Sequence, residues 1–262
     1  MWNSPAFSFL ESYPFNDTDN YYVIVTDYGV DKIDVNRVKN NKRGNVKYVL
    51  LFLNPLSRDK TRYAQSNTAF FDLVLSFDPD DCKKHGFDYY PLVYSKREIA
   101  SERTTGSDKS AYFIGYDKGR GELLSGIAER LQEIGVRCVF KVKQGSANKR
   151  YPNLTYLSGI LPYDKVLEDI AATDCIVEII QPGQSGATLR YAEAVCYNKI
   201  LITTNKMITE LPCYNAKYMH IIEKPEDIEP SWFQLNEPIE YNYNGEFSPK
   251  KLLAFVEEQL TT

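Results

Sequence analysis

The stretch "IVEIIQPGQSGATLRYAEAVCYNKILIT", residues 176–203, decides the fold. It begins with an apolar strand, continues through a loop with Gly183 and Gly186, and then forms a helix that carries Arg190 and Glu193. A second apolar strand closes the stretch. Two apolar strands joined by one helix are typical of a parallel sheet, because parallel neighbours need a long crossover.

The sequence before and after this stretch repeats the pattern. Strands are expected at 111–116, 137–143, 175–180, 199–205 and 218–223, and helices at 121–136, 164–174 and 188–198. One stripe of the first helix carries Leu123, Leu124, Ile127, Leu131 and Ile134, which is typical of a helix packed on a sheet. Ser248 and Pro249 begin a last helix. This part of the chain is expected to be Rossmann-like, with helices on both faces of its sheet.

The first third of the chain has strands but little helix. Apolar runs at 21–27, 47–54, 71–78 and 89–95 predict four buried strands, and the segments between them have weak helical periodicity. Residues 96–110 are polar and predict a linker. We therefore expect an α/β protein with a small N-terminal domain, residues 1–100, and a Rossmann-like domain with a C-terminal helix, residues 101–262.

Composition excludes several classes of protein. The 262 residues are 43% hydrophobic and 25% charged, which is typical of a globular chain, and the net charge of −4 disfavours a nucleic-acid partner. Five cysteines without a C-x-x-C pair and only two histidines predict reduced thiols, a cytoplasmic protein and no metal. No apolar run approaches the roughly 20 residues that cross a bilayer.

Two strand-to-helix loops have a composition that suits a phosphorylated ligand. The first, "FIGYDKGRGELL", places Gly115, Lys118 and Arg120 between a strand and a helix. Glycine lets the backbone approach an anion, and the helix N-terminus adds favourable potential. The loop lacks the glycine spacing of a dinucleotide fingerprint or a P-loop. The alternative is a solvated turn whose charges face water.

The second loop is the "QPGQSGAT" of the opening stretch. Ser185 and Thr188 offer hydroxyl groups, and the helix that follows offers free N–H groups. Arg190 lies close enough to the helix start to bind an anion, and Glu193 lies one turn later, where it could accept hydrogen bonds from sugar hydroxyls. The alternative is an ordinary surface pair of Arg190 with Glu193. Both loops follow strands of one sheet, so a single binding site explains both.

A resemblance to a known family adds to this interpretation. The order "FIGYDKGR", "GILPYDKVLEDIAATDCIVEI" and "GQSGATLRYAEAVCYNKILITTN" resembles the donor-binding half of GT-B glycosyltransferases, most closely bacterial enzymes of capsular polysaccharide or lipopolysaccharide biosynthesis. It covers about residues 70–206, including "LVLSFDPDDCKKHGFDYYPLVYS". The resemblance implies a GT-B-like fold of two Rossmann-like domains with parallel sheets, the N-terminal one abbreviated. It implies that the donor contacts Gln184, Ser185, Gly186, Thr188, Arg190, Glu193, Lys118 and Arg120, beside Gly115.

The sequence departs from the family pattern in two places. Ser185 stands where retaining GT-B enzymes have a glutamate, and Glu178 is the nearest carboxylate, so the stereochemical outcome stays open. Only about 100 residues precede the linker, so the acceptor half is short or is completed by a partner. For an inverting transfer, the expected base is Asp27, Asp78 or His85 from the N-terminal domain; the alternatives are turn-forming aspartates and a histidine that ends a helix.

These observations predict a hexosyltransferase that moves sugar from a nucleoside-diphosphate sugar to a cell-surface polysaccharide or glycan. The catalytic candidates are Asp27, Asp78 and Glu178, and neither a metal nor a cofactor beyond the donor substrate is expected. The expected partners are the nucleotide sugar and a glycan or lipid-linked acceptor, with an oligomer and attachment to the inner face of the membrane left open. A catalytically silent homologue that binds an active glycosyltransferase is the main alternative. A sugar-nucleotide epimerase would need more acid and base residues near the donor.

Overall fold

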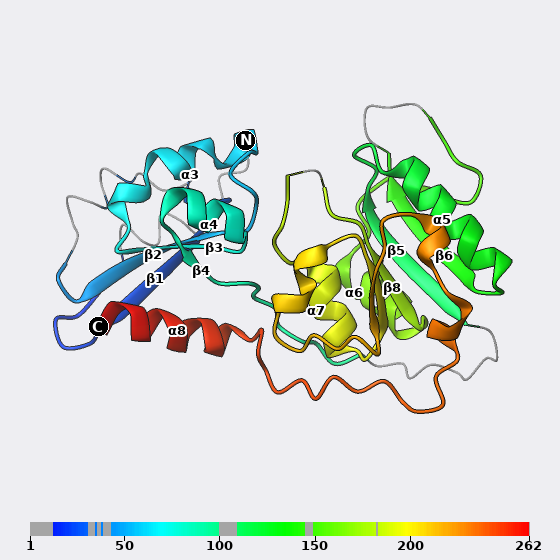
Figure 1. The fold of residues 1–262 in the computed structure, drawn as a ribbon. Helices are drawn as coiled ribbons and strands as arrows, with labels where there is room; N and C mark the ends of the chain where they lie inside the picture. Colours follow the sequence, from blue (N-terminus) through cyan, green and yellow to red (C-terminus); the bar gives the residue numbers. More distant parts are fainter. Residues whose placement is uncertain are drawn as a thin grey trace. The chain divides into compact units, whose positions relative to one another are not determined.

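The computed structural model describes residues 13–30, 35, 38, 43–99, 109–144, 149–181 and 183–261. The chain divides into two compact units (Figure 1). Unit 1 comprises Met1–Pro91, Gly183–Gly186 and Pro249–Thr262, and unit 2 comprises Leu92–Pro182 and Ala187–Ser248. The boundary expected at residue 100 thus falls at residue 91, and the last helix groups with the first unit. Residues 100–108 of the expected linker lie outside the described residues.

Unit 1 contains a four-stranded parallel sheet in the order β1-β2-β3-β4. Its strands are β1 (Tyr21–Thr26), β2 (Val46–Phe52), β3 (Leu73–Ser76) and β4 (Asp88–Tyr89). Its helical elements are short except for the last: η2 (Asp59–Thr61), α3 (Arg62–Ser66), η3 (Thr68–Phe70), α4 (Pro79–His85) and α8 (Pro249–Thr261). Between β2 and β3 the weak helical signal corresponds to short helices, whereas residues 31–34, 36, 37 and 39–42, between β1 and β2, lie outside the described residues.

The strand expected at 89–95 ends after two residues. Beyond Pro91, the side chains of Leu92 and Tyr94 are buried in the core of unit 2, and the Tyr94 amide donates a 2.7 Å hydrogen bond to the Phe247 carbonyl. The apolar pattern of this segment is thus explained by burial without a sheet partner. Apolar periodicity alone does not distinguish such a buried extended segment from a strand.

Unit 2 contains a six-stranded parallel sheet in the order β10-β9-β8-β5-β6-β7. Its strands are β5 (Ser110–Tyr116), β6 (Arg137–Lys143), β7 (Thr155–Leu157), β8 (Cys175–Glu178), β9 (Ile200–Thr203) and β10 (Met219–Ile221). Its helical elements are α5 (Gly121–Glu133), α6 (Tyr163–Ala171), α7 (Leu189–Cys196), η4 (Lys206–Glu210), η5 (Pro225–Asp227) and η6 (Pro230–Phe233). Counted in chain order the strands run 6-5-4-1-2-3, the Rossmann arrangement read from its other edge.

Helices cover both faces of this sheet, as the sequence predicts. The apolar stripe of α5 packs on one face, where Leu124, Ile127 and Leu131 are fully buried. On the other face, α6 and α7 pack Ile170 and Val195 against the sheet (Figure 1). The short strand β7 was not expected, because its three residues carry no apolar alternation long enough to be recognised.

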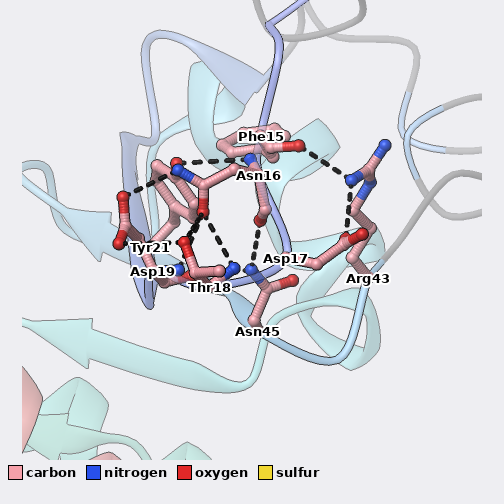
Figure 2. A network of polar contacts seen from close by, with 8 residues as sticks. All are labelled: Phe15, Asn16, Asp17, Thr18, Asp19, Tyr21, Arg43 and Asn45. Carbon is pink, nitrogen blue, oxygen red and sulfur yellow. Dashed lines mark hydrogen bonds and ion pairs between the residues drawn. The ribbon is translucent and has the colours of Figure 1, made fainter.

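A network of polar contacts links the residues before β1 to the residues before β2 in unit 1 (Figure 2). The side-chain carbonyl of Asn16 accepts hydrogen bonds from the backbone amides of Thr18 and Asp19, which forms a tight turn before β1. The side-chain amide of Asn45 donates to the carbonyls of Asn16 and Asp19, at 2.7 Å each. Arg43 donates to the Phe15 carbonyl. The turn before β1 is therefore hydrogen-bonded to the residues that directly precede β2.

Candidate functional site

The candidate site lies at the carboxyl edge of the unit 2 sheet, between β5 and β8. These two strands are neighbours, with Ala111 beside Cys175 and Tyr112 beside Ile176. The chain runs from β5 outward to β6 on one side and from β8 outward to β9 on the other. Such a point, where the strand order reverses, is where ligands bind in open α/β sheets. Both loops singled out in the sequence leave the sheet here, one after β5 and the other after β8.

The loop after β5 is built by its own backbone and side chains. The Asp117 carboxylate accepts a 2.8 Å hydrogen bond from the Gly121 amide and thereby caps the beginning of α5. Lys118 and Gly119 both have positive φ angles, 48° and 82°, which produce the tight turn. A Cβ atom on Gly121 would lie 2.8 Å from the Tyr151 ring. Glycine is therefore required at position 121 for the helix to begin this close to the ring.

Arg120 joins the two loops. Its guanidinium group donates to the carbonyls of Tyr116, which ends β5, and Asp117, and to the carbonyl of Ile179, which follows β8. A Cβ atom on Gly115 would lie 3.3 Å from one terminal nitrogen of this group, so glycine leaves room for it. Arg120 lies at the carboxyl edge of the sheet, and its carbonyl partners were not foreseen; its contact with an anion stays a prediction. A positive charge is thus fixed at the point where the strand order reverses.

Two lysines flank an exposed tyrosine at the same edge. Tyr116 ends β5 and is 45% exposed. The Nζ atoms of Lys118 and Lys143 lie 5.8 Å and 5.7 Å from the centre of its ring, within the range of a cation–π contact. Lys143 ends β6, so one cation comes from the loop after β5 and the other from the neighbouring strand. Lys118 therefore lies where the sequence predicts a cation, and Lys143 adds another that the sequence analysis did not single out.

Glu178 ends β8 and is buried, with a relative exposure of 1%. Its two carboxylate oxygens accept hydrogen bonds from the hydroxyl groups of Thr188, at 2.5 Å, and Thr203, at 2.6 Å. Burial raises the pKa of this carboxyl, and the two hydroxyl bonds oppose the rise. A catalytic role for Glu178 stays a prediction, since the bonds observed are those of a residue that positions Thr188.

Thr188 in turn begins α7. Its hydroxyl oxygen accepts a 3.0 Å hydrogen bond from the Arg190 amide, the usual bond of a helix N-cap. The helix start expected at residue 188 is confirmed by this cap. Glu178, Thr188 and the Arg190 backbone therefore form a fixed connection from the end of β8 to the first turn of α7.

Arg190 and Glu193 form a buried ion pair. The two charged groups approach to 2.7 Å, and their side chains are 15% and 0% exposed. The second oxygen of the Glu193 carboxylate accepts a 2.9 Å hydrogen bond from the Tyr163 hydroxyl. Burial raises the pKa of Glu193, whereas Arg190 lowers it. The pair is therefore not the exposed surface pair considered above, and the Glu193 carboxylate is held inside the protein.

The glycine-rich loop, Gly183–Gly186, belongs to unit 1, where it binds Asp78. The Asp78 carboxylate accepts hydrogen bonds from the Ser185 amide and hydroxyl, at 2.9 Å and 2.8 Å, and from the Gly186 amide at 3.2 Å. A Cβ atom on Gly186 would lie 2.4 Å from Phe77, so only glycine fits. Gln184 donates a 3.4 Å hydrogen bond to the Gly186 carbonyl. Donor contacts of Gln184, Ser185 and Gly186 stay predictions.

The other carboxylate and histidine candidates of unit 1 also have identified partners. Asp27 is 4% exposed, and its carboxylate accepts hydrogen bonds from the Leu53 amide at 3.0 Å and the Asn54 side chain at 2.7 Å. Asp78 additionally caps α4 through the amides of Asp80 and Asp81. His85 is the last residue of α4, as the alternative interpretation expected, and stacks on Phe87. Their catalytic roles stay predictions.

Among the described residues, no group of three or more His, Cys, Asp or Glu side chains is arranged to hold a metal ion. In the same residues, no helix has the length and hydropathy needed to cross a membrane.

Two solved structures support the fold. The chain is similar to sucrose-phosphate synthase from Thermosynechococcus elongatus, with 8% identity, a TM-score of 0.53, and coverage of 92% of this chain and 73% of that one. It is also similar to the catalytic domain of starch synthase IV from Arabidopsis thaliana bound to ADP and acarbose, with 9% identity, a TM-score of 0.53, and coverage of 93% and 73%. No protein-family model and no curated protein sequence matches the chain. The expected GT-B-like fold, with two parallel Rossmann-like sheets, is confirmed.

The sequence analysis missed two tyrosines whose hydroxyl groups are connected to Glu193 by hydrogen bonds. Tyr163 begins α6, and Tyr94 lies in the extended segment after β4, yet both belong to the hydrogen-bond network of Glu193. Neither lies near Glu193 in the sequence, and a tyrosine in an apolar segment is an ordinary core residue. No local pattern signals such a contact. Asp117 differs, because its partner, the Gly121 amide, lies only four residues away in the sequence.

Proposed function

We propose that this protein is a glycosyltransferase that uses a nucleoside-diphosphate sugar, and that the donor binds at the carboxyl edge of the unit 2 sheet. The observation that carries the proposal is the Arg120 guanidinium, which is fixed between the loops after β5 and β8. Lys118 lies on the same loop, and Arg190 lies in the first turn of α7, where the helix dipole adds favourable potential for an anion. Cations and a helix N-terminus gathered at a switch point favour a diphosphate.

The proposed roles follow from this chemistry. Lys118, Arg120 and Arg190 bind the diphosphate, and Gly115 leaves space for the Arg120 side chain. In the transfer, an acceptor hydroxyl oxygen bonds to the anomeric carbon while the bond from that carbon to the diphosphate oxygen breaks. The bonding electrons leave with the nucleoside diphosphate, and the acceptor proton passes to a base. The fixed cations stabilise the negative charge that develops on the departing diphosphate.

The substrate classes belong to the same proposal. We propose a hexose donor and a bacterial cell-surface polysaccharide or glycan acceptor, with the reaction in the cytoplasm or at the inner face of the membrane. Support for the acceptor comes from the sequence resemblance between residues 70 and 206. The starch synthase domain that shares the fold is described as bound to ADP and acarbose, a nucleoside diphosphate and a sugar-like ligand. That description favours the same ligand classes here.

The first test is a panel of nucleoside diphosphates, UDP, GDP, ADP and dTDP, screened by thermal shift and measured by calorimetry. Replacing Arg190 by alanine is expected to weaken the best ligand at least tenfold, about 1.4 kcal/mol. The matched control is Arg62→Ala, because Arg62 also forms an i,i+3 ion pair, with Asp59, but is 78% exposed. The Arg62→Ala variant should bind the nucleoside diphosphate with the affinity of the unmodified protein. If none of the four diphosphates binds, the donor-site assignment is wrong.

Turnover distinguishes the enzyme from a catalytically silent homologue. The purified protein is given the corresponding nucleotide sugars, and released nucleoside diphosphate is measured with and without a glycan acceptor. Release by the unmodified protein, reduced in Arg120→Ala, supports a transferase. Diphosphate binding without any release from the sugar donors contradicts the proposed activity and favours a binding protein.

A further inference from the structure

A line of tyrosine hydroxyl groups, most of them partly buried, leads to the Glu193 carboxylate. The hydroxyl oxygens of Tyr94 and Tyr163 are 2.7 Å apart, and the Tyr163 hydroxyl donates to Glu193 at 2.9 Å. The Tyr197 hydroxyl lies 3.2 Å from that of Tyr94 and donates to the Arg97 carbonyl. These residues belong to unit 2 but come from three places, the segment after β4, the first turn of α6 and the end of α7.

The direction of these bonds follows from counting protons. Each tyrosine hydroxyl has a single proton to donate. Tyr163 directs its proton to the carboxylate and Tyr197 directs its proton to the Arg97 carbonyl, so neither has a proton left for Tyr94. Tyr94 can donate its proton to Tyr163 at 2.7 Å or to Tyr197 at 3.2 Å, and the shorter contact, which needs a proton between its two oxygens, favours Tyr163. Both donations, from Tyr94 to Tyr163 and from Tyr163 to Glu193, therefore point toward the carboxylate. Such an arrangement favours the ionised form of Glu193, which pairs with Arg190.

Burial decides what Glu193 can contact. Its side chain has no exposed surface, so a ligand hydroxyl cannot reach the carboxylate in this conformation. Arg190 keeps 15% of its side chain exposed and carries several N–H donors, of which the ion pair engages one terminal nitrogen. The paired atoms are 2.7 Å apart but lack the angles of a hydrogen bond. Glu193 thus restrains the guanidinium while other N–H groups stay available for a ligand.

We infer that Tyr94, Tyr163 and Glu193 are positioning residues that hold the Arg190 guanidinium in place for a nucleoside diphosphate. The inference rests on the proposed function, because it takes Arg190 as a diphosphate ligand. It gives Glu193 a role other than the expected acceptance of hydrogen bonds from sugar hydroxyls, which stays a prediction. An arginine whose long side chain is fixed before binding loses less conformational freedom when the ligand arrives, so the fixed pair strengthens binding.

Tyr163→Phe is the variant that tests this inference, because it removes the hydroxyl group and keeps the ring. Its affinity for the best nucleoside diphosphate of the panel is expected to fall about threefold to tenfold. The control is Tyr241→Phe, which removes another buried hydroxyl of unit 2, one that donates to the Lys199 carbonyl at 2.9 Å. That control should lose similar stability in thermal unfolding but keep the affinity of the unmodified protein.

A double-variant cycle separates positioning from general weakening of the fold. If Tyr163 acts through Arg190, adding Tyr163→Phe to Arg190→Ala produces no further loss of affinity. The inference is overturned if Tyr163→Phe binds with unchanged affinity, or if the double variant loses affinity by the product of the two single losses. Neither result contradicts the proposed donor site. Unchanged affinity in Arg190→Ala overturns both the inference and the assignment of Arg190 as a diphosphate ligand. The two failures are therefore distinguishable.

Discussion

Both units bury carboxylates at the carboxyl edge of a parallel sheet, but they hold them in different ways. In unit 1, Asp27 and Asp78 accept hydrogen bonds mostly from backbone amides. In unit 2, Glu178 and Glu193 accept from the hydroxyl groups of threonines and a tyrosine, and Glu193 also pairs with Arg190. The aspartates therefore fix loops, whereas the glutamates fix other side chains.

The difference follows from side-chain length and the elements that carry these residues. An aspartate directly after a strand has a short side chain, which reaches the amides of nearby turns. Glu178 ends a central strand, and Glu193 lies inside a helix, so the backbone amides nearest to them are already bonded. Their longer side chains reach the side chains of neighbouring elements. Substitutions at the aspartates should thus disturb loops, and those at the glutamates should disturb individual contacts.

The largest expected effect is at Asp78. Asp78→Ala removes the acceptor for two amides of α4, two amides of the Gly183–Gly186 loop and the Ser185 hydroxyl. Buried donors without partners are costly, so the free energy of unfolding should fall by roughly 3 to 5 kcal/mol in urea titrations. Asp80→Ala is the control, since Asp80 is exposed in the first turn of α4, and it should cost less than about 1 kcal/mol. Equal losses in both would contradict the loop-fixing role.

The sequence specifies the fold well where periodicity is long. The α5 stripe and the alternation of strands with helices in residues 111–223 predict the six-stranded sheet, because each pattern has a single way to bury its apolar residues. Errors occur in short segments. β7 has three residues and was missed, and the apolar run at 89–95 proved to be the last residue of the two-residue strand β4 followed by an extended segment in which Leu92 and Tyr94 are buried. In both, tertiary packing decides what the local pattern leaves open.

The site could be predicted only in part, for a similar reason. Glycines and cations at a strand-to-helix turn depend on local geometry, so Lys118 and Arg120 are found at the expected edge. Contacts with residues from distant parts of the sequence leave no such local pattern. The Ile179 carbonyl reaches Arg120 only when β5 and β8 pair in the sheet. The Tyr163 hydroxyl reaches Glu193 only when α6 packs beside α7. For Glu193, the sequence thus predicts the position on the helix but not the burial of the side chain.

The next largest expected effect is a pH-dependent change in the stability of the protein on substitution of Glu178. Because burial raises the pKa of this carboxyl above 4.5, the folded protein holds its proton to higher pH than the unfolded chain does. The stability contributed by the group is therefore full below pH 4.5 and falls as pH rises through the raised pKa. Glu178→Gln has no proton to lose, so the variant should gain stability relative to the unmodified protein as pH increases.

Thermal and urea unfolding at several pH values between 4 and 8 measure this difference. At pH 7 we expect Glu178→Gln to change the free energy of unfolding by less than about 1.5 kcal/mol, because an amide can bond to both threonine hydroxyls. Thr203→Val, which removes one of these hydroxyls, is the matched test of the contact itself. A stability difference that does not vary with pH would contradict the buried, raised-pKa state of Glu178.

The smallest expected effect on stability is that of Asp27→Asn, and it also tests the proposed chemistry. The amide oxygen can still accept from the Leu53 amide, and a rotation of the Asn54 side-chain amide restores the other bond. The loss should therefore be below about 1 kcal/mol, whereas Asp27→Ala leaves the Leu53 amide without this acceptor and should cost about 1 to 3 kcal/mol. If Asp27 is the base of the transfer, Asp27→Asn lowers the turnover number by about 10² to 10⁴ while the fold stays intact. Turnover within tenfold of the unmodified protein would exclude Asp27 as the base and leave it, like Asp78, as a residue that fixes a loop.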